Sequence, residues 1–218
     1  MIELRITGTR NELRTQLAGL WPGAERILAQ ARAQIGPATT KEVWDEQAMA
    51  IGYLAAQYSS RTASFLELGT AHGFSAAIMR CAAPNAFITT LEPDPTNRAI
   101  ARANLNPLSI VVRPEQSLAY LGLTEDGRQQ KKHNLIFVDG DHKRIRADLP
   151  WWNRLKVDGL FLHHDYSPLE SARPCPPVFE ALNEFSARLG REPDVLLVDD
   201  TGVGLWGMYR RQGEVWES

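Results

Sequence analysis

The sequence predicts an α/β fold built on a doubly wound, mostly parallel sheet. After residue 61, short apolar runs alternate with segments of helical length, which is the pattern of a parallel sheet with crossover helices. Several runs are apolar throughout, as expected for strands covered on both faces. The seven runs are Ser64–Leu68, Phe87–Leu91, Ser109–Val112, Leu135–Val138, Gly159–Leu162, Asp194–Val198 and Gly204–Tyr209. Only residues 199–203 separate the last two runs, too few for a parallel crossover, so the last strand should be antiparallel.

The segments between the runs predict helices, and so does most of the N-terminal part. Helical length and composition are found at Phe74–Ala82, Pro95–Leu105, Lys143–Leu155 and Val178–Leu189. Near Asn11–Gln34 and Thr40–Tyr58, apolar residues recur at intervals of three and four, the period of a helix with one buried face. We therefore expect a mostly helical N-terminal segment, residues 1–60, followed by an α/β domain, residues 61–218.

Composition is that of a globular protein with no evident preference for a charged partner. Of 218 residues, 44% are hydrophobic and 23% charged, and the formal net charge is −2. This balance gives no reason to expect nucleic acid or an anionic membrane as partner. No apolar run approaches the roughly 20 residues of a membrane span, and the N-terminus lacks the apolar core of a signal peptide. Cys81 and Cys175 suggest neither a disulfide framework nor a zinc site by spacing, so a cytoplasmic location is expected.

The loop after the first strand of the predicted sheet is rich in glycine and contains an acid. Gly69 and Gly73 allow a tight turn and close approach of a ligand to the backbone. Their spacing differs from the G-x-G-x-x-G of dinucleotide folds. Glu67 would repel a pyrophosphate and attract an ammonium group. A tight strand-to-helix turn explains the glycines alone about as well, but it does not explain Glu67 together with Ser75.

Other acids and imidazoles follow further strands, where ligands bind in such sheets. Glu92 could accept hydrogen bonds from ribose hydroxyls. Taken alone it is better explained as a solvated strand-end acid, but together with the first loop that explanation is the weaker one. Asp139 and His142 follow the fourth strand, and His164 and Asp165 follow the fifth. These four should converge and could hold a hard divalent cation, with water and substrate completing its shell. The alternative is a hydrogen-bonded polar network at the sheet edge.

That alternative is favoured for His163, because strand alternation points it away from His164. It is disfavoured for Asp139 and Asp165. Two buried carboxylates near one another raise each other's pKa unless a cation compensates.

Two stretches resemble a known family. Leu66–Ser75, reading LELGTAHGFS, resembles the first motif of class I S-adenosylmethionine-dependent methyltransferases, in the form found in catechol-type O-methyltransferases. Phe137–Tyr166, with D-G-D-H near its start and H-D-Y at its end, resembles the macrocin-type and cephalosporin-biosynthesis-related O-methyltransferases. The resemblance extends over residues 60–210. It implies a Rossmann-like, seven-stranded sheet with an antiparallel last strand.

The resemblance also implies roles for individual residues. The cofactor S-adenosylmethionine would contact Glu67, Gly69, Thr70, Gly73, Ser75, Glu92, Ser117 and Asp139, with Glu92 at the ribose and Ser117 near the adenine. A divalent cation, Mg²⁺ or Mn²⁺, would be held by Asp139, Asp165 and His164, or by Asp165 alone from the fifth strand. His142 would be the general base, and Asp139 would be the second catalytic residue. An imidazole is a less natural Mg²⁺ ligand than a carboxylate.

The implied reaction is a direct displacement, in which an oxygen of a small hydroxylated molecule attacks the sulfonium methyl. N-methylation remains open, and the N-terminal helices could support a homo-oligomer. Three alternatives differ in class. A nicotinamide-dependent oxidoreductase is disfavoured because G-x-G-x-x-G is missing. An inactive S-adenosylmethionine-binding or scaffold protein is disfavoured because acids remain at four strand ends. A metal-dependent hydrolase would leave the glycine loop and Glu92 without a role.

Overall fold

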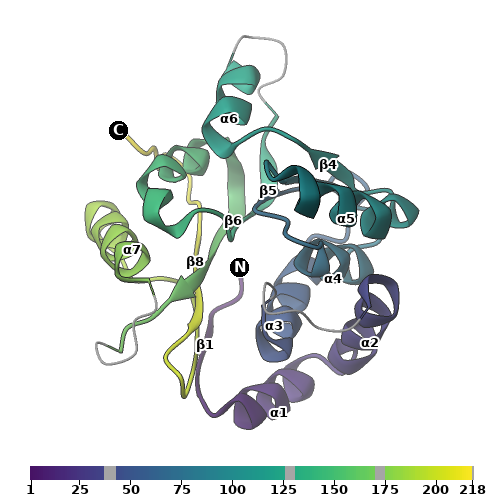
Figure 1. The fold of residues 1–218 in the computed structure, drawn as a ribbon. Helices are drawn as coiled ribbons and strands as arrows, with labels where there is room; N and C mark the ends of the chain where they lie inside the picture. Colours follow the sequence, from purple (N-terminus) through teal and green to yellow (C-terminus); the bar gives the residue numbers. More distant parts are fainter. Residues whose placement is uncertain (37–42, 126–130, 170–174, 218) are drawn as a thin grey trace.

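A mixed sheet organises the chain in the computed structural model, which describes residues 1–36, 43–125, 131–169 and 175–217 (Figure 1). The described residues form eight strands in the order β1-β7-β8-β6-β5-β2-β3-β4. The strands are β1 Leu4–Gly8, β2 Ser64–Leu68, β3 Phe87–Leu91, β4 Val111–Arg113, β5 His133–Val138, β6 Leu155–Tyr166, β7 Val195–Asp199 and β8 Gly204–Tyr209. Within this sheet β8 runs antiparallel to both neighbours, β6 and β7, and the other pairs are parallel. The predicted fold class and antiparallel last strand are confirmed.

The N-terminal segment contains a strand that the sequence did not predict. In β1, Leu4 and Ile6 are buried and Arg5 is exposed, so the strand has one apolar face. β1 pairs in parallel with β7 and becomes an edge of the sheet. A five-residue strand with two buried apolar side chains gives a weaker periodic signal than the fully apolar runs. The described part of the first 60 residues is mostly helical as expected, but β1 was not predicted, and it gives the sheet a strand beyond the predicted seven.

The helices flank the sheet in chain order. They are α1 Arg10–Leu20, α2 Ala24–Ile35, α3 Asp45–Ala56, α4 Phe74–Ala82, α5 Pro95–Leu105, α6 Ser117–Glu125 and α7 Pro176–Leu189, with a short 3₁₀ turn η1 at Asn106–Leu108. Helices α4 and α5 have the predicted bounds. The start of the predicted segment at Thr40 lies outside the described residues. Where the chain is described, none of its helices combines the length and apolarity that crossing a bilayer requires.

The segment Lys143–Leu155 departs from the predicted single helix. It forms two 3₁₀ helices, η2 His142–Ala147 and η3 Leu149–Arg154, and Leu155 already begins β6. Arg144 has non-helical dihedral angles inside η2. Pro150 stands in the first turn of η3, where its missing N–H and its ring prevent a helix from continuing through it. The break places Asp148 between the two turns.

Apolar side chains cover both faces of the sheet. In β5, Leu135 and Phe137 belong to one core, and Ile136 and Val138 belong to the other. Successive side chains of a strand point to opposite faces, which is why this run is apolar throughout. The first core also contains buried residues of α1, α2 and α3. The N-terminal segment thus packs into the same core as the sheet, and its separation as a domain at residue 60 stays a prediction.

The carboxyl ends of the central strands are in direct backbone contact. Gly69 N donates to Leu91 O at 3.1 Å, and Asp139 N donates to Leu68 O at 2.8 Å. Gly69 has a φ of +98°, and a Cβ built there would lie 2.2 Å from Asp139 O. Only glycine fits this position without moving β5 away from β2.

We expect Gly69→Ala to lower the free energy of unfolding by about 3 kcal/mol or more, because backbone strain and steric overlap each cost about 1–3 kcal/mol. Gly190→Ala is the matched control. Gly190 also has a positive φ, +67°, but a Cβ there would meet no atom within 4 Å, so about 1 kcal/mol is expected. Urea unfolding followed by circular dichroism measures both. Equal losses in the two variants would contradict the close approach.

His133 makes folding stability depend on pH. It is buried at the start of β5, with Ser64 Oγ at 3.1 Å from Nδ1 and the Trp151 ring edge-on to the imidazole. Burial lowers the pKa of His133 to about 3, and nearby positive charges, first that of Lys131, act in the same direction. In the unfolded chain the pKa of the imidazole is near 6.5. As the pH falls, His133 is therefore protonated in the unfolded chain before it is protonated in the folded protein. The contribution of His133 to stability is complete above pH 6.5 and is lost as pH falls toward 3.

We expect that lowering the pH from 7 to 5 costs the wild type about 2 kcal/mol more than His133→Gln, because one proton is worth about 1.4 kcal/mol per pH unit. Urea unfolding at both pH values provides the comparison. The control is His72→Gln, which removes the imidazole of a half-buried loop residue outside the His133 environment. This variant should keep the wild-type dependence of the free energy of unfolding on pH. A wild-type slope in His133→Gln would contradict the assignment.

Candidate functional site

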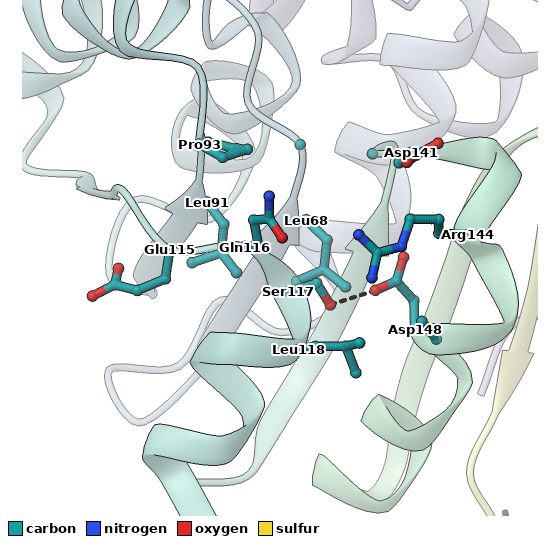
Figure 2. A pocket seen from close by; sticks show the side chains of 13 residues that line it. Leu68, Leu91, Pro93, Glu115, Gln116, Ser117, Leu118, Asp141, Arg144 and Asp148 are labelled. Carbon is teal, nitrogen blue, oxygen red and sulfur yellow. Dashed lines mark hydrogen bonds between the residues drawn. The ribbon is translucent and has the colours of Figure 1, made fainter.

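Two adjacent pockets lie at the carboxyl ends of the parallel strands. The larger, about 370 Å³, is here called the acid–imidazole pocket, and it is lined by Val43, Trp44, Gly69, Thr70, Ala71, Phe74, Ser75, Asp139, His142, His164, Asp165 and Val203. The other, about 220 Å³, is here called the apolar pocket (Figure 2), and its lining is Leu68, Gly69, Leu91, Pro93, Glu115, Gln116, Ser117, Leu118, Gly140, Asp141, Arg144, Ala147 and Asp148. Gly69 belongs to both linings, so the two pockets meet at this residue.

Glu67 supports the glycine loop from below. Its fully buried carboxyl group accepts hydrogen bonds from the hydroxyls of Ser75 and Thr90. Burial raises the pKa of Glu67 to about 8, although both hydrogen bonds act in the opposite direction. Thr70 bonds in turn to Thr90. Of the predicted loop residues, Gly69, Thr70 and Ser75 line the acid–imidazole pocket, whereas Glu67 lies outside the described walls of both pockets.

Gly73 and Glu92 shape the loop without lining either pocket, as far as the described residues define them. Gly73 precedes α4 with a φ of +98°, and a Cβ there would lie 2.8 Å from the side chain of Leu105. Glu92 is buried after β3 and accepts hydrogen bonds from Ala71 N at 2.7 Å and Asp94 N at 3.0 Å. Its carboxylate therefore ties the glycine loop to the end of the neighbouring strand.

Ser117 lies in the apolar pocket beside an acid that the sequence analysis missed. Its hydroxyl donates to Asp148 Oδ1 and accepts from Trp151 Nε1 at 2.8 Å. Figure 2 shows the Ser117–Asp148 bond, with the Arg144 side chain reaching toward the same carboxylate. Burial raises the pKa of Asp148 to about 6, while the Ser117 hydrogen bond and the charge of Arg144 oppose it. No role was predicted for Asp148 from the sequence, and the break between η2 and η3 brings it beside Ser117.

The four predicted acids and imidazoles converge in the acid–imidazole pocket. His164 Nδ1 lies 3.1 Å from Asp139 Oδ1 and 3.2 Å from Asp165 Oδ1. His142 Nε2 lies 2.8 Å from Asp165 Oδ2 and 4.0 Å from Asp139 Oδ1. Burial alone would raise the pKa of Asp165, but the hydrogen bond from His142 and the nearby imidazole of His164 hold it well below its usual range. The convergence predicted from the strand ends is present.

An irregular strand end aims these side chains. The pairing of β6 with β8 changes register between His163 and Tyr166, and Asp165 has a φ of +57°, unusual for a residue with a side chain. This bulge lets His164 and Asp165 reach the same pocket, although they are neighbours in the chain. His163 turns the other way and is fully buried, with its ring centroid 4.5 Å from that of Phe161. His163 thus points away from His164 as expected. Its two ring nitrogens have no hydrogen-bond partner among the described residues, so the hydrogen-bonded network expected for it is wrong.

A residue of the N-terminal segment fixes the orientation of His164. Gln47 Oε1 lies 2.9 Å from His164 Nε2 and also accepts from Trp44 N at 3.0 Å. Because this Gln47 atom accepts from a backbone N–H, it is the amide oxygen and can only accept from His164 as well. His164 Nε2 therefore carries a proton. Nothing in the sequence links residue 47 to residue 164, so Gln47 was not predicted as a site residue.

The donor atoms fit a divalent cation. His164 Nδ1 is buried and has no well-aligned hydrogen bond from the described residues, and it faces two carboxylates. Atoms of Asp139, His164 and Asp165 all lie within 4.8 Å of one another. Burial lowers the pKa of His164, but the two carboxylates outweigh it and raise the pKa to about 10. The same field attracts a metal ion, and an imidazole whose other N–H is held by an oxygen is a typical metal ligand.

Comparison with known proteins identifies the family of this domain. Residues 66–166, from the end of β2 to the end of β6, match the methyltransferase domain family. The chain carries a methyltransferase domain. This confirms the resemblance to class I S-adenosylmethionine-dependent methyltransferases, while the macrocin-type subgroup stays a prediction. Comparison with curated proteins gives no match.

Solved structures share the methyltransferase fold over nearly the whole chain. An O-methyltransferase from Bacillus cereus in complex with SAH is 18% identical, with a TM-score of 0.64, over 90% of this chain and 96% of that one. The O-methyltransferase TomG from Streptomyces achromogenes, involved in tomaymycin synthesis and in complex with SAM, is 17% identical, with a TM-score of 0.64 over 90% and 95%. The SAH-bound methyltransferase PaMTH1 from Podospora anserina is 18% identical, with a TM-score of 0.61 over 92% and 94%. At these identities the likeness concerns the fold.

Proposed function

We propose that the protein is an S-adenosylmethionine-dependent O-methyltransferase that methylates a hydroxyl group of a small molecule with the help of a divalent cation. One observation carries the proposal. The glycine loop typical of cofactor binding and the acid–imidazole cluster line a single pocket. Gly69 and Ser75 of the loop and Asp139 and Asp165 of the cluster all belong to its lining. A methyl donor held by the loop would lie beside groups able to bind and deprotonate a hydroxyl.

The two pockets together suit the shape of the cofactor. Its nucleoside would occupy the apolar pocket, with the adenine near Ser117 and the ribose near Glu92. Its methionine portion would pass over Gly69 into the acid–imidazole pocket, where Thr70 and Ser75 lie. Since Glu67 is bonded to Ser75, its role would be to hold the loop in place beneath the methionine portion of the cofactor.

Asp139, His164 and Asp165 are the residues that would hold Mg²⁺ or Mn²⁺. Carboxylate oxygens suit both ions, and the imidazole suits transition metals, which favours Mn²⁺. When bound, such a cation lowers the pKa of a coordinated hydroxyl and fixes its orientation.

The protein's own side chains would complete the reaction. His142 would accept the proton of the acceptor hydroxyl at Nδ1, because its Nε2 donates to Asp165. This hydrogen bond, which raises the pKa of His142 against the effect of burial, would stabilise the resulting imidazolium. The acceptor oxygen forms a bond to the methyl carbon while the carbon–sulfur bond breaks, leaving S-adenosylhomocysteine and a methyl ether. Val43, Trp44 and Phe74 contribute apolar surface to the pocket, which an acceptor could contact.

The proposal predicts both binding and metal dependence. Calorimetry should detect binding of S-adenosylhomocysteine and no binding of NADH, which separates this function from an oxidoreductase. Transfer of radioactive methyl groups to a panel of small hydroxylated acceptors should stop with EDTA and resume with Mg²⁺ or Mn²⁺. Asp139→Asn should abolish the metal-dependent activity. Transfer that persists in EDTA would remove the cation from the proposal, and an absence of nucleoside binding would refute the function.

A second prediction concerns the base. His142→Ala should lower kcat by about 10²–10⁴-fold, the usual contribution of general acid–base catalysis, with an unchanged Kd for S-adenosylhomocysteine. Lys143→Ala changes the next residue, which is exposed, and should leave both quantities near wild type. Steady-state kinetics and calorimetry report them separately. Wild-type turnover in His142→Ala would exclude it as the base.

A further inference from the structure

A second cluster of possible metal ligands lies beside the acid–imidazole pocket. His142 Nε2 is 2.8 Å from Asp165 Oδ2, and Cys175 Sγ is 3.9 Å from the same oxygen. Ligand atoms of all three residues lie within 4.8 Å of one another, and each residue is half-buried. We propose that His142, Asp165 and Cys175 form a Zn²⁺ site distinct from the donor set of Asp139, His164 and Asp165.

Asp165 serves both donor sets through different oxygen atoms. Its Oδ1 faces His164 Nδ1 at 3.2 Å, and its Oδ2 faces His142 and Cys175. The left-handed backbone of Asp165 at the β6 bulge directs its carboxylate between the two groups. Each oxygen can therefore contribute to one site without leaving the other.

The chemistry of the donors separates the two sites. The set of Asp139, His164 and Asp165 offers two carboxylates and one imidazole, which suits Mg²⁺ or Mn²⁺. The second set replaces one carboxylate by a sulfur, and thiolate together with imidazole is the preferred ligand combination of Zn²⁺. Binding would release the thiol proton of Cys175 to solvent, since the thiolate is the form that coordinates.

The position of Cys175 gives the site both a defined geometry and access. Cys175 is the residue that precedes α7, and its carbonyl oxygen accepts from Val178 N at 3.0 Å, so the start of the helix fixes it. A pocket bordered by His142, Lys143 and Cys175 opens next to the three donors. It offers an ion a route from solvent and leaves room for water as a fourth ligand.

Occupation of this site would inhibit methyl transfer. Zn²⁺ would bind His142 Nε2 in place of its hydrogen bond to Asp165, so the His142 side chain could no longer act as the base for the acceptor hydroxyl. This consequence rests on the proposed function, whereas the binding of Zn²⁺ does not. The protein would then respond to free Zn²⁺ through a residue, Cys175, that takes no part in the proposed methylation.

Co²⁺ provides a spectroscopic test, because cobalt bound to thiolate absorbs in the near ultraviolet and cobalt bound only to oxygen and nitrogen does not. We expect titration of the full chain with CoCl₂ to produce this band and ZnCl₂ to displace it. Cys175→Ser should lose the band and bind Zn²⁺ at least about tenfold more weakly, since even outer partners of a metal site contribute 10–100-fold. Cys81→Ser, which changes the half-buried cysteine of α4, is the matched control and should keep both properties.

Several results would overturn the inference. They are a wild-type spectrum without the band, a band that survives Cys175→Ser, and equal Zn²⁺ affinities for the wild type and that variant. His142→Ala should weaken Zn²⁺ binding while circular dichroism reports an intact fold. In the methylation assay, Zn²⁺ should inhibit the wild type more than Cys175→Ser, with equal activities when Zn²⁺ is absent. The spectra decide the site even if the protein methylates nothing, so the two proposals can fail independently.

Discussion

The close approach of β2 and β5 at their carboxyl ends is the constraint on which the site depends. Gly69 has no side chain, so the carbonyl of Asp139 can lie where a Cβ would otherwise stand, and the backbone of Asp139 bonds to Leu68. The glycine loop and the first acid of the cluster are therefore parts of one rigid junction. Both pockets meet at Gly69. If β2 and β5 stood further apart, the two pockets would be separated from each other.

The N-terminal segment completes this junction. Gln47 of α3 accepts the His164 N–H and turns the other ring nitrogen toward the two carboxylates. Val43 and Trp44, just before α3, line the same pocket. Buried residues of α1, α2 and α3 share a core with the sheet. Changes in this segment can therefore alter the chemistry of the cluster without touching the strands that provide it.

The sequence predicted what depends on local patterns and missed what depends on distant contacts. Short runs rich in apolar residues located β2, β3 and β8, and strand ends brought together His142, His164 and the two aspartates. The strand β1 was missed because one short amphipathic strand gives little periodicity. Gln47 and Asp148 were missed because their partners lie 117 and 31 residues away. Glu67 was expected beside the cofactor, yet its hydrogen bonds place it beneath the loop.

The backbone conformation of Asp165 lowers the stability of the fold, whereas its side chain is needed for the proposed chemistry. A residue with a Cβ in the left-handed region costs about 1–2 kcal/mol, and glycine would adopt the same φ of +57° without that cost. Selection for stability alone would therefore not maintain an aspartate at this bulge. Attempts to engineer a more heat-resistant protein by relieving strain would reach this residue early, and they would gain robustness by removing the carboxylate that joins the two clusters.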